Sequence, residues 1–536
     1  MNFNKSYFII EAIKIKHVFI LLFVLLNSSS FSQLLDTSVI NIFAKEIKAE
    51  DLKSHLLELA SDKYAGRETG EEGQRLAANY LAQYYNNTGL KGFTPDYFQH
   101  YPISQEKAKE SSFSFQEKEF KFLKDYFFFP RFDAQELNAS EVYFAGYGIN
   151  DSAYNDYKNL NLKYKMAIVL DGEPIAPNGQ YVISKSNKQS RWSESIRAKL
   201  EEAKNQGLNA LLIVDENIDQ NIKTYKHSIE KPLTKLDGED NKTKGRIPYF
   251  YISKEVAEKI LGKSIKEIKS DVNEDKSLKS VNVKGNLKIK IEREQQKLNA
   301  QNVLAFIPGS HFKDEYVVFS AHYDHLGIQD GKIYYGADDD GSGTVAVLEL
   351  AQAFYESYKK GKGPKRNVLF INFSGEEKGL LGSEFYSKNP IVPLTQTVCN
   401  LNIDMIGRLD KEHEKNPNYV YIIGSDKLSS DLHAINEEAN KKAGDLTLDY
   451  TYNKPSDPNR FYYRSDHYNF AKNNIPVIFY FTGVHADYHK PTDTVDKIDF
   501  NKMEKITRLI FYTAWEIANR NDRIRVDKVN DFKSNR

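Results

Sequence analysis

The second half of the chain, from about Asn302 onwards, alternates short β-branched and aromatic runs with longer stretches of helical periodicity. This alternation constrains the fold more than any other feature, because parallel strands joined by helices form a sheet that is covered on both faces. The expected fold class is therefore α/β, with a mostly parallel, twisted sheet between layers of helices. We expect strands at residues 316–321, 368–373, 398–403 and 477–482 and a final helix through residues 503–515.

The first half of the chain has a different texture. Apolar residues between Asp51 and Tyr85 recur at helical spacing on both sides of the turn Gly66–Gly70, which predicts two packed helices. Residues 135–265 then combine short β-like runs with one helix, which favours a small β-rich domain inserted into the main one. We therefore divide the chain into a signal peptide (1–32), an N-terminal helical segment of the catalytic domain (33–134), the insert (135–265), a linker and return strand (266–301), the catalytic domain (302–525) and a C-terminal tail (526–536).

The N-terminus has the pattern of an export signal. Lys14 and Lys16 precede a nine-residue apolar run, Val18 to Leu26, which is followed by small residues up to Ser32. A membrane-spanning helix needs about 20 apolar residues, so the length of this run favours a cleaved signal peptide over the alternative of a retained anchor. We expect residues 33–536 to be exported, to the periplasm or out of the cell, with no membrane association after signal removal.

Charge and cysteine content exclude several classes of protein. Lys plus Arg and Asp plus Glu both number 74, so the chain lacks the large positive excess typical of nucleic-acid binders. Its single cysteine, Cys399, excludes an intrachain disulfide framework and a cysteine-rich zinc module. Any bound metal must therefore be held by His, Asp and Glu.

Metal-competent side chains follow each expected strand of the second half. Ligands of open α/β sheets collect at the carboxyl ends of the strands. In this chain those positions are followed by His322, by Glu376 and Glu377, by Asp404 and by His489. The loop 336–343 adds three adjacent aspartates, which repel one another unless a cation neutralises them. This set of residues predicts a metal centre.

The other histidines and the competing motifs are weaker candidates. Asp324 lies two residues after His322 and is suited to orient its imidazole, whereas we expect His325 to be structural. Buried or positioning roles are expected for Asp466, His467 and His485. The sequence has no H-E-x-x-H pair and no G-x-S-x-G elbow, which excludes a helix-borne zinc protease and gives no support to a serine hydrolase. A dinucleotide-like glycine pattern at 341–346 follows three aspartates, where a pyrophosphate would be repelled.

Five segments, in order, resemble the bacterial double-zinc aminopeptidases, the family that also contains glutamate carboxypeptidase. They are Ser320–Gly327, Gly336–Gly343, Asn372–Ser383, Asn402–Arg408 and Tyr488–Thr494. Residues 59–70 are similar to the N-terminal segment of that family, and the insert resembles its protease-associated domain.

The resemblance implies a site with two zinc ions per chain, for which the nitrogen and oxygen ligands also suit cobalt or manganese. It places Glu376 as the general base, and Tyr488 as a donor to the oxyanion or, alternatively, as a packing residue. Asp339, the second Asp of its motif, is implied as the bridge between the metals. The remaining implied ligands are His322 and Asp404 for one zinc and Glu377 and His489 for the other.

The function expected on this basis is an exported zinc exopeptidase acting on peptides, and an aminopeptidase in preference to a carboxypeptidase. A carboxypeptidase would need a basic pocket, for which Arg408, Arg460 and Arg464 are available. Two alternatives from other classes are a glutaminyl cyclase-like enzyme, which uses one zinc, and a receptor-like binding protein, which would have lost ligands or the base. The sequence leaves the oligomeric state open, with a homodimer among the alternatives.

Overall fold

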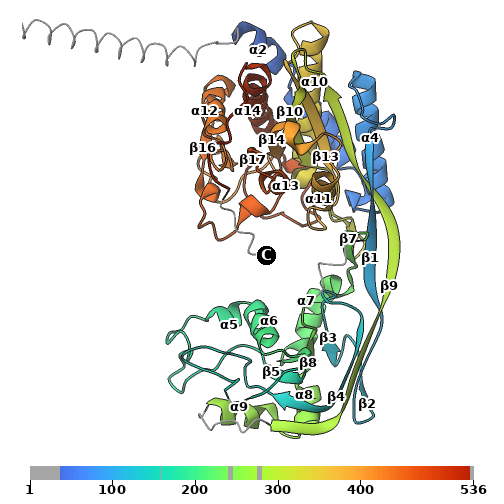
Figure 1. Cartoon of the computed structure of the whole chain (residues 1–536), viewed down its shortest axis with the longest axis vertical. Coiled ribbons are helices and arrows are strands. Elements are labelled where there is room, and N and C mark those ends of the chain that lie inside the picture. The colour runs from blue at the N-terminus through green and yellow to red at the C-terminus, as the bar shows by residue number, and fades with distance from the viewer. Residues whose placement is uncertain (1–36, 159, 239–244, 274–280, 531–536) are drawn as a thin grey trace, which may run out of the picture. The chain divides into compact units, whose positions relative to one another are not determined.

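The computed structural model describes residues 37–158, 160–238, 245–273 and 281–530 (Figure 1). The predicted signal peptide lies outside these residues. The chain divides into two compact units. The first unit contains the residues up to Tyr101 and from Asn299 onwards, and the second contains Pro102–Leu298.

The sheet of the first unit has the strand order β16-β15-β17-β14-β10-β13-β9. Its four central strands, β13, β10, β14 and β17, are parallel, whereas β9 and β15 run antiparallel to their neighbours β13 and β17. The predicted mostly parallel sheet and its four strands are therefore confirmed. The strands are β9 (Val281–Ile307), β10 (Phe312–His322), β13 (Arg366–Phe373), β14 (Thr397–Ile403), β15 (Tyr419–Ile423), β16 (Thr447–Asp449) and β17 (Val477–Phe481).

Helices cover both faces of this sheet (Figure 1). Val317 and Phe319 of β10 pack into one apolar core, and Val318 between them packs into another, so the central part of the strand is buried and apolar on both faces. The first core contains residues of α2 (Thr37–Ala44), α3 (Ala49–Leu59), α4 (Glu72–Thr88), α10 (Gly343–Lys359), α12 (Ser430–Ala443) and α14 (Phe500–Asn519). The second contains residues of α11 (Leu381–Lys388) and α13 (His467–Ala471).

The strand order places a switch point at β10. This strand lies between β13 and β14, which follow it in the sequence and pair with it on opposite sides. The carboxyl ends of all four parallel strands meet at one edge, where open α/β sheets bind ligands. The fold thus brings residues 322, 374–377, 404 and 482–489 to the same edge of the first unit.

The second unit is built on a parallel run of four strands, β4-β5-β6-β8, bordered by antiparallel β3 and by the start of β9. The strands expected between residues 142 and 252 lie in this run. The strands of this run and its border are β3 (Tyr126–Phe127), β4 (Gln135–Phe144), β5 (Met166–Leu170), β6 (Ala210–Asp215) and β8 (Tyr249–Ser253). The helices of the unit are α5 (Arg191–Glu194), α6 (Ile196–Asn205), α7 (Ile218–Glu230), α8 (Lys254–Leu261) and α9 (Ile265–Asn273). Its remaining strands are β1 (Phe98–Phe115), β2 (Lys118–Phe120) and β7 (Leu233–Leu236). Its likeness to a protease-associated domain stays a prediction.

The second unit is wider than the insert expected at residues 135–265. Strands β1 and β9 extend it on both sides, to Pro102 and Leu298. Their sequences are polar and rich in charges, so they cannot be recognised as apolar runs.

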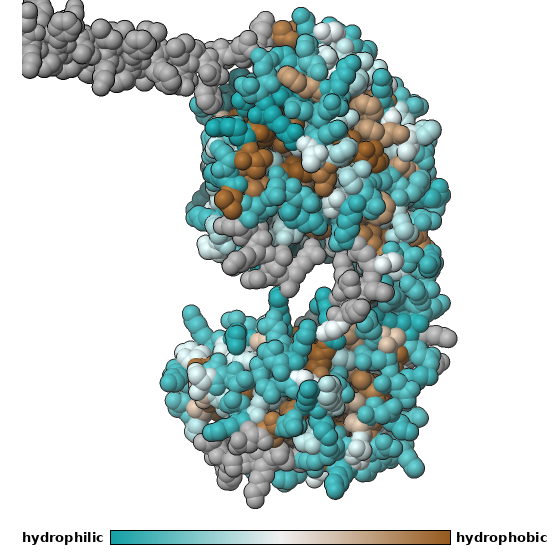
Figure 2. Space-filling model, in the orientation of Figure 1, coloured by the Kyte–Doolittle hydropathy of each residue, from teal (hydrophilic) through white to brown (hydrophobic). Residues whose placement is uncertain are grey.

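In the face shown in Figure 2 most residues are hydrophilic, with apolar ones gathered in a few patches. None of the helices within the described ranges has both the length and the apolarity needed to cross a bilayer.

Candidate metal centre

His322, the last residue of β10, is the centre of one group of ligand-type side chains. Its Nε2 atom lies 3.4 Å from Asp339 Oδ1, 3.7 Å from Asp404 Oδ2 and 3.8 Å from Glu376 Oε2. The imidazole is oriented from its other side, where Nδ1 lies 3.1 Å from the backbone oxygen of Asp324. His322, Asp339 and Asp404 are buried and could hold a metal ion together.

Only one of the three adjacent aspartates faces this group. Asp340 accepts hydrogen bonds from the backbone N–H groups of His322, Gly343 and Met405 at 2.8–3.1 Å. Asp338 accepts one from Gly407 at 2.6 Å and has its second oxygen 3.3 Å from His485 Nε2. Asp340 and Asp338 therefore hold loops together, which leaves Asp339 directed into the site.

The second oxygen of Asp339 faces a second group. Its Oδ2 atom lies 3.1 Å from His489 Nε2 and 3.9 Å from His325 Nδ1. Glu377 lies between the same two rings, with Oε1 2.9 Å from His325 Nδ1 and Oε2 3.4 Å from His489 Nε2. Asp339, Glu377 and His325 form a second group able to hold a metal, so Asp339 is common to both groups.

The polar atoms of this second group fit a bound cation. Asp339 Oδ2, Glu377 Oε1 and both ring nitrogens of His325 are buried and make no well-aligned hydrogen bond with the described residues, although they lie close to one another and to His489. Such atoms cost free energy unless something else pairs with them. An all-nitrogen and oxygen set of carboxylates and imidazoles suits zinc, and also cobalt or manganese.

The ionisation of these groups is strongly perturbed. Burial acts to raise the pKa of Asp339, but the facing imidazoles of His322 and His489 outweigh it and hold that pKa well below its usual range. Burial and Asp339 act to raise the pKa of Glu377, yet the two facing imidazoles lower it to about 2. Burial raises the pKa of Glu376 well above its ordinary value. The first two carboxylates are thus ionised, as metal ligands must be.

Comparison with known proteins identifies this part of the chain. Residues 302–514 match the model of peptidase family M28. The first unit contains a peptidase family M28 domain. A probable leucine aminopeptidase of Arthroderma otae is 31% identical over 238 residues, which is 43% of this chain and 61% of the relative. A probable glutamate carboxypeptidase of Arabidopsis thaliana is 33% identical over 105 residues, 19% of this chain and 14% of the relative.

Solved structures show the same fold over most of the chain. An aminopeptidase from Aneurinibacillus sp. strain AM-1 superposes with a TM-score of 0.54 at 18% identity, covering 91% of this chain and 98% of that one. A zinc aminopeptidase from Bacillus subtilis gives a TM-score of 0.51 at 18% identity, covering 91% and 99%. The matches to the leucine aminopeptidases span about three fifths of their length.

An open pocket in the M28 domain reaches several of the ligand-type residues. His322, Asp339, Glu376 and Asp404 line one side of it, and Tyr488 and His489 form part of the wall. The rings of these last two residues stack with their centroids 3.8 Å apart. The rest of the lining is apolar except for Arg464, and it consists of Met405, Phe461, Phe479, Phe481 and Val484.

Of the three arginines considered for a carboxylate pocket, only Arg464 lines this one. Its guanidinium lies over the Phe461 ring and 3.4 Å from the Tyr488 hydroxyl. Arg408 is paired with Asp487 at 2.9 Å, and Arg460 lies over the Tyr463 ring. The M28 domain therefore presents one guanidinium beside several carboxylates.

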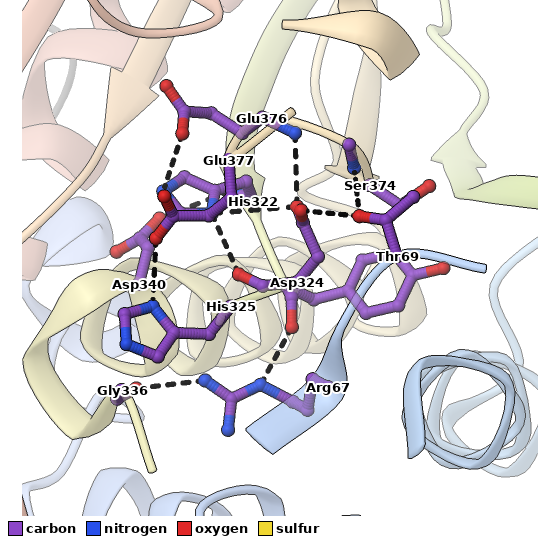
Figure 3. Close-up of polar contacts among 12 residues, drawn as sticks. Arg67, Thr69, His322, Asp324, His325, Gly336, Asp340, Ser374, Glu376 and Glu377 are labelled. Carbon is purple, nitrogen blue, oxygen red and sulfur yellow. Dashed lines mark hydrogen bonds and ion pairs between the residues drawn. The ribbon is translucent and has the colours of Figure 1, made fainter. Parts of the chain in front are cut away.

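His325 and the turn at Gly66–Gly70 contact the M28 site more closely than expected from sequence. His325 was expected to be structural, but it faces Glu377 at 2.9 Å and belongs to a possible ligand group. Its position three residues after His322 was the available signal. Asp324, expected to orient His322 through its carboxylate, does so mainly through its backbone oxygen, since its Oδ1 atom is 3.7 Å from Nδ1. Figure 3 shows these residues converging.

Proposed function

We propose that this chain is an exported exopeptidase that uses two zinc ions and removes N-terminal residues from peptides. The observation that carries the proposal is the position of Asp339, whose two carboxylate oxygens face two separate groups of ligand-type side chains. His322 and Asp404 would hold one ion, and Glu377 and His489 the other. Buried His325 lies close enough to Glu377 to join or support the second group.

The residues around Asp339 suit peptide hydrolysis. Two bound zinc ions would polarise the peptide carbonyl and lower the pKa of water. Glu376 lines the pocket without being needed as a ligand, and its raised pKa suits a group that accepts a proton from the attacking water. As the C–N bond breaks, Glu376 returns that proton to the departing amine. The Tyr488 hydroxyl is placed to donate to the carbonyl oxygen as negative charge develops there.

An aminopeptidase is favoured over a carboxypeptidase by the charge of the pocket. Asp339, Glu376 and Asp404 line it, and carboxylates attract the ammonium group of a free N-terminus. The curated relatives named leucine aminopeptidase agree with this direction. The apolar wall would receive the side chain of the residue that is released.

One observation supports the carboxypeptidase alternative. Arg464 is exposed at the pocket and could pair with the carboxylate of a C-terminal residue. The glutaminyl cyclase and receptor alternatives have less support, since all five implied ligands and the base are present together at one edge of the sheet.

The decisive experiment uses matched peptides that differ only at their ends, with the purified mature chain and added zinc. N-acetylation should abolish cleavage and C-amidation should leave it unchanged. The opposite pattern would establish a carboxypeptidase, with Arg464 as its anchor. A metal content of one per chain would support the cyclase, and failure to cleave any free peptide would support the receptor.

A further inference from the structure

We propose that the turn Gly66–Gly70 is a positioning element of the metal centre, in which Arg67 sets the ligand loops and Thr69 sets the general base. The inference rests on the proposed function, because it assigns Glu376 as the base. The turn precedes the M28 domain by more than 200 residues, outside the matched range 302–514. Its contacts nevertheless reach three of the loops that carry ligand-type side chains, those of His322, Asp339 and Glu376 (Figure 3).

The backbone of the turn is fitted closely to the loop that follows β10. Gly66 has a φ of 71°, and a Cβ atom there would come within 2.5 Å of the backbone oxygens of Gly327 and Tyr334. Gly66 O accepts a hydrogen bond from Gly327 N at 3.0 Å, and Arg67 O accepts one from His325 N at 3.3 Å. These close contacts fix the position of the turn against the segment that contains His322, Asp324 and His325.

Arg67 joins this segment to the aspartate loop. Its guanidinium is fully buried and donates to the backbone oxygen of Tyr323, next to His322, at 2.7 Å. It also donates to Tyr335 O at 2.8 Å, Gly336 O at 2.9 Å and Leu59 O at 3.0 Å. A planar group with fixed donors sets the distance between two loops in a way that a flexible lysine cannot. Arg67 thus fixes the positions of the loops that carry His322 and Asp339 relative to each other.

Thr69 joins the His322 segment to the loop of the general base. Its buried hydroxyl donates to Asp324 Oδ2 at 2.6 Å and accepts the Gly375 N–H at 3.1 Å. The other oxygen of Asp324, Oδ1, accepts the Glu376 N–H at 3.2 Å. Thr69 and Asp324 therefore bind two consecutive N–H groups of the Gly375–Glu376 backbone. Through them the base is held at its distance from His322.

Glu68 adds a third connection to the same loop. Its carboxylate pairs with Lys378 Nζ at 2.5 Å, and the Lys378 side chain is only 4% exposed. Lys378 directly follows the ligand-type residue Glu377. Three consecutive side chains of the turn, Arg67, Glu68 and Thr69, thus contact three of the ligand-bearing loops. Replacing each of them should disturb a different part of the centre.

The test compares Thr69→Val, which removes the hydroxyl at nearly constant volume, with Thr69→Ser, which keeps it. Thr507→Val is the matched control, because Thr507 is equally buried but its hydroxyl bonds only within α14, to Met503 O at 2.7 Å. Measurements on the full mature chain are kcat, KM, zinc content, the absorption spectrum with Co²⁺ in place of zinc, and Tm.

Thr69→Val should lower kcat about 10- to 100-fold, the usual effect of losing an outer hydrogen bond at a metal site, with two metals retained and KM within a few-fold. The Co²⁺ spectrum should change, and Thr69→Ser should restore both kcat and spectrum. Thr507→Val should lower Tm without moving either. The inference is overturned if Thr69→Val and Thr507→Val have the same kcat and spectrum.

Arg67→Lys tests the proposed role of Arg67 separately from that of Thr69. It should weaken zinc binding about 10- to 100-fold, measured by calorimetry on the metal-free chain, while Thr69→Val should not. Unchanged zinc affinity in a folded Arg67→Lys chain would overturn the role of Arg67. Failure of the proposed function would be seen differently, as a wild-type chain that binds fewer than two metals or cleaves no free peptide.

Discussion

Both units of this protein place charged residues beside the ends of parallel strands, but the hydrogen bonding of those charged groups differs between the units. In the second unit, Lys199 Nζ donates to the backbone oxygens of Leu170 at 2.9 Å and Gly172 at 2.6 Å, just after β5. Glu173 accepts hydrogen bonds from the backbone and hydroxyl of Ser190 at 2.7 and 2.8 Å. Each of these charges has partners within the fold.

In the first unit, the corresponding edge holds buried polar atoms that crowd against one another without well-aligned hydrogen bonds. Asp339 Oδ2, Glu377 Oε1 and the ring nitrogens of His325 are the clearest examples. Because an unpaired buried polar group costs about 1–3 kcal/mol, a fold retains a cluster of them only where something else pairs with them. The comparison teaches that charge at a strand end does not mark a site by itself. Several ligand-type groups that face one another, as they do around Asp339, are the better sign.

Asp339→Ala should have the largest effect, because it removes the side chain common to both ligand groups. Metal content should fall below two per chain and turnover should be lost. Elemental analysis together with a peptide assay checks this. The counterpart in the second unit is Glu173→Gln, which should leave metal content unchanged. Two metals remaining in Asp339→Ala would show that another aspartate serves as the bridge.

Glu376→Gln should be next in size. Turnover should fall about 10²- to 10⁴-fold, the usual cost of removing a general base, while both metals stay bound. Steady-state kinetics and metal analysis on the same preparation are needed. Loss of a metal instead would mean that Glu376 and Glu377 have exchanged roles.

Metal removal should destabilise the first unit alone. Ligand binding stabilises a fold by about 4 kcal/mol when the free ligand is 1,000 times its Kd. The chain has two tryptophans, with Trp515 in the core of the first unit and Trp192 in that of the second. In Trp192→Phe, emission from Trp515 should report a lower Tm after chelation. In Trp515→Phe, emission from Trp192 should not shift, and an equal shift in both would contradict the comparison.

Lys199→Met should have the smallest effect, and only on the second unit. Two buried carbonyl oxygens lose their donor, which should cost about 1–3 kcal/mol of unfolding free energy. Denaturant unfolding followed by Trp192 emission measures it. Metal content and kcat should equal those of the wild type. A changed kcat would show that Lys199 contributes to catalysis.

The sequence was sufficient for the sheet of the first unit and for the types of residue at its edge. Strands buried on both faces contain continuous apolar runs, so β17 and the Val317–Phe319 part of β10 are visible without a structure. The boundaries between the two units were harder to predict, because β1 and β9 are long and polar. The contacts of Arg67 could not be predicted, since three of the four are to backbone oxygens more than 250 residues away and leave no pattern in the local sequence.

The bond between Thr69 and Asp324 spans 255 positions of the chain, and the whole second unit lies between them. During synthesis the N-terminal turn therefore has no loops to dock against until the second unit has emerged from the ribosome. Closing so long a segment carries an entropic cost that grows only with the logarithm of its length, and prior folding of the second unit would shorten the effective span. His489 and α14 come later still. The metal centre is thus among the last parts of the chain to be assembled, so a nascent chain carries no complete site while it is being made.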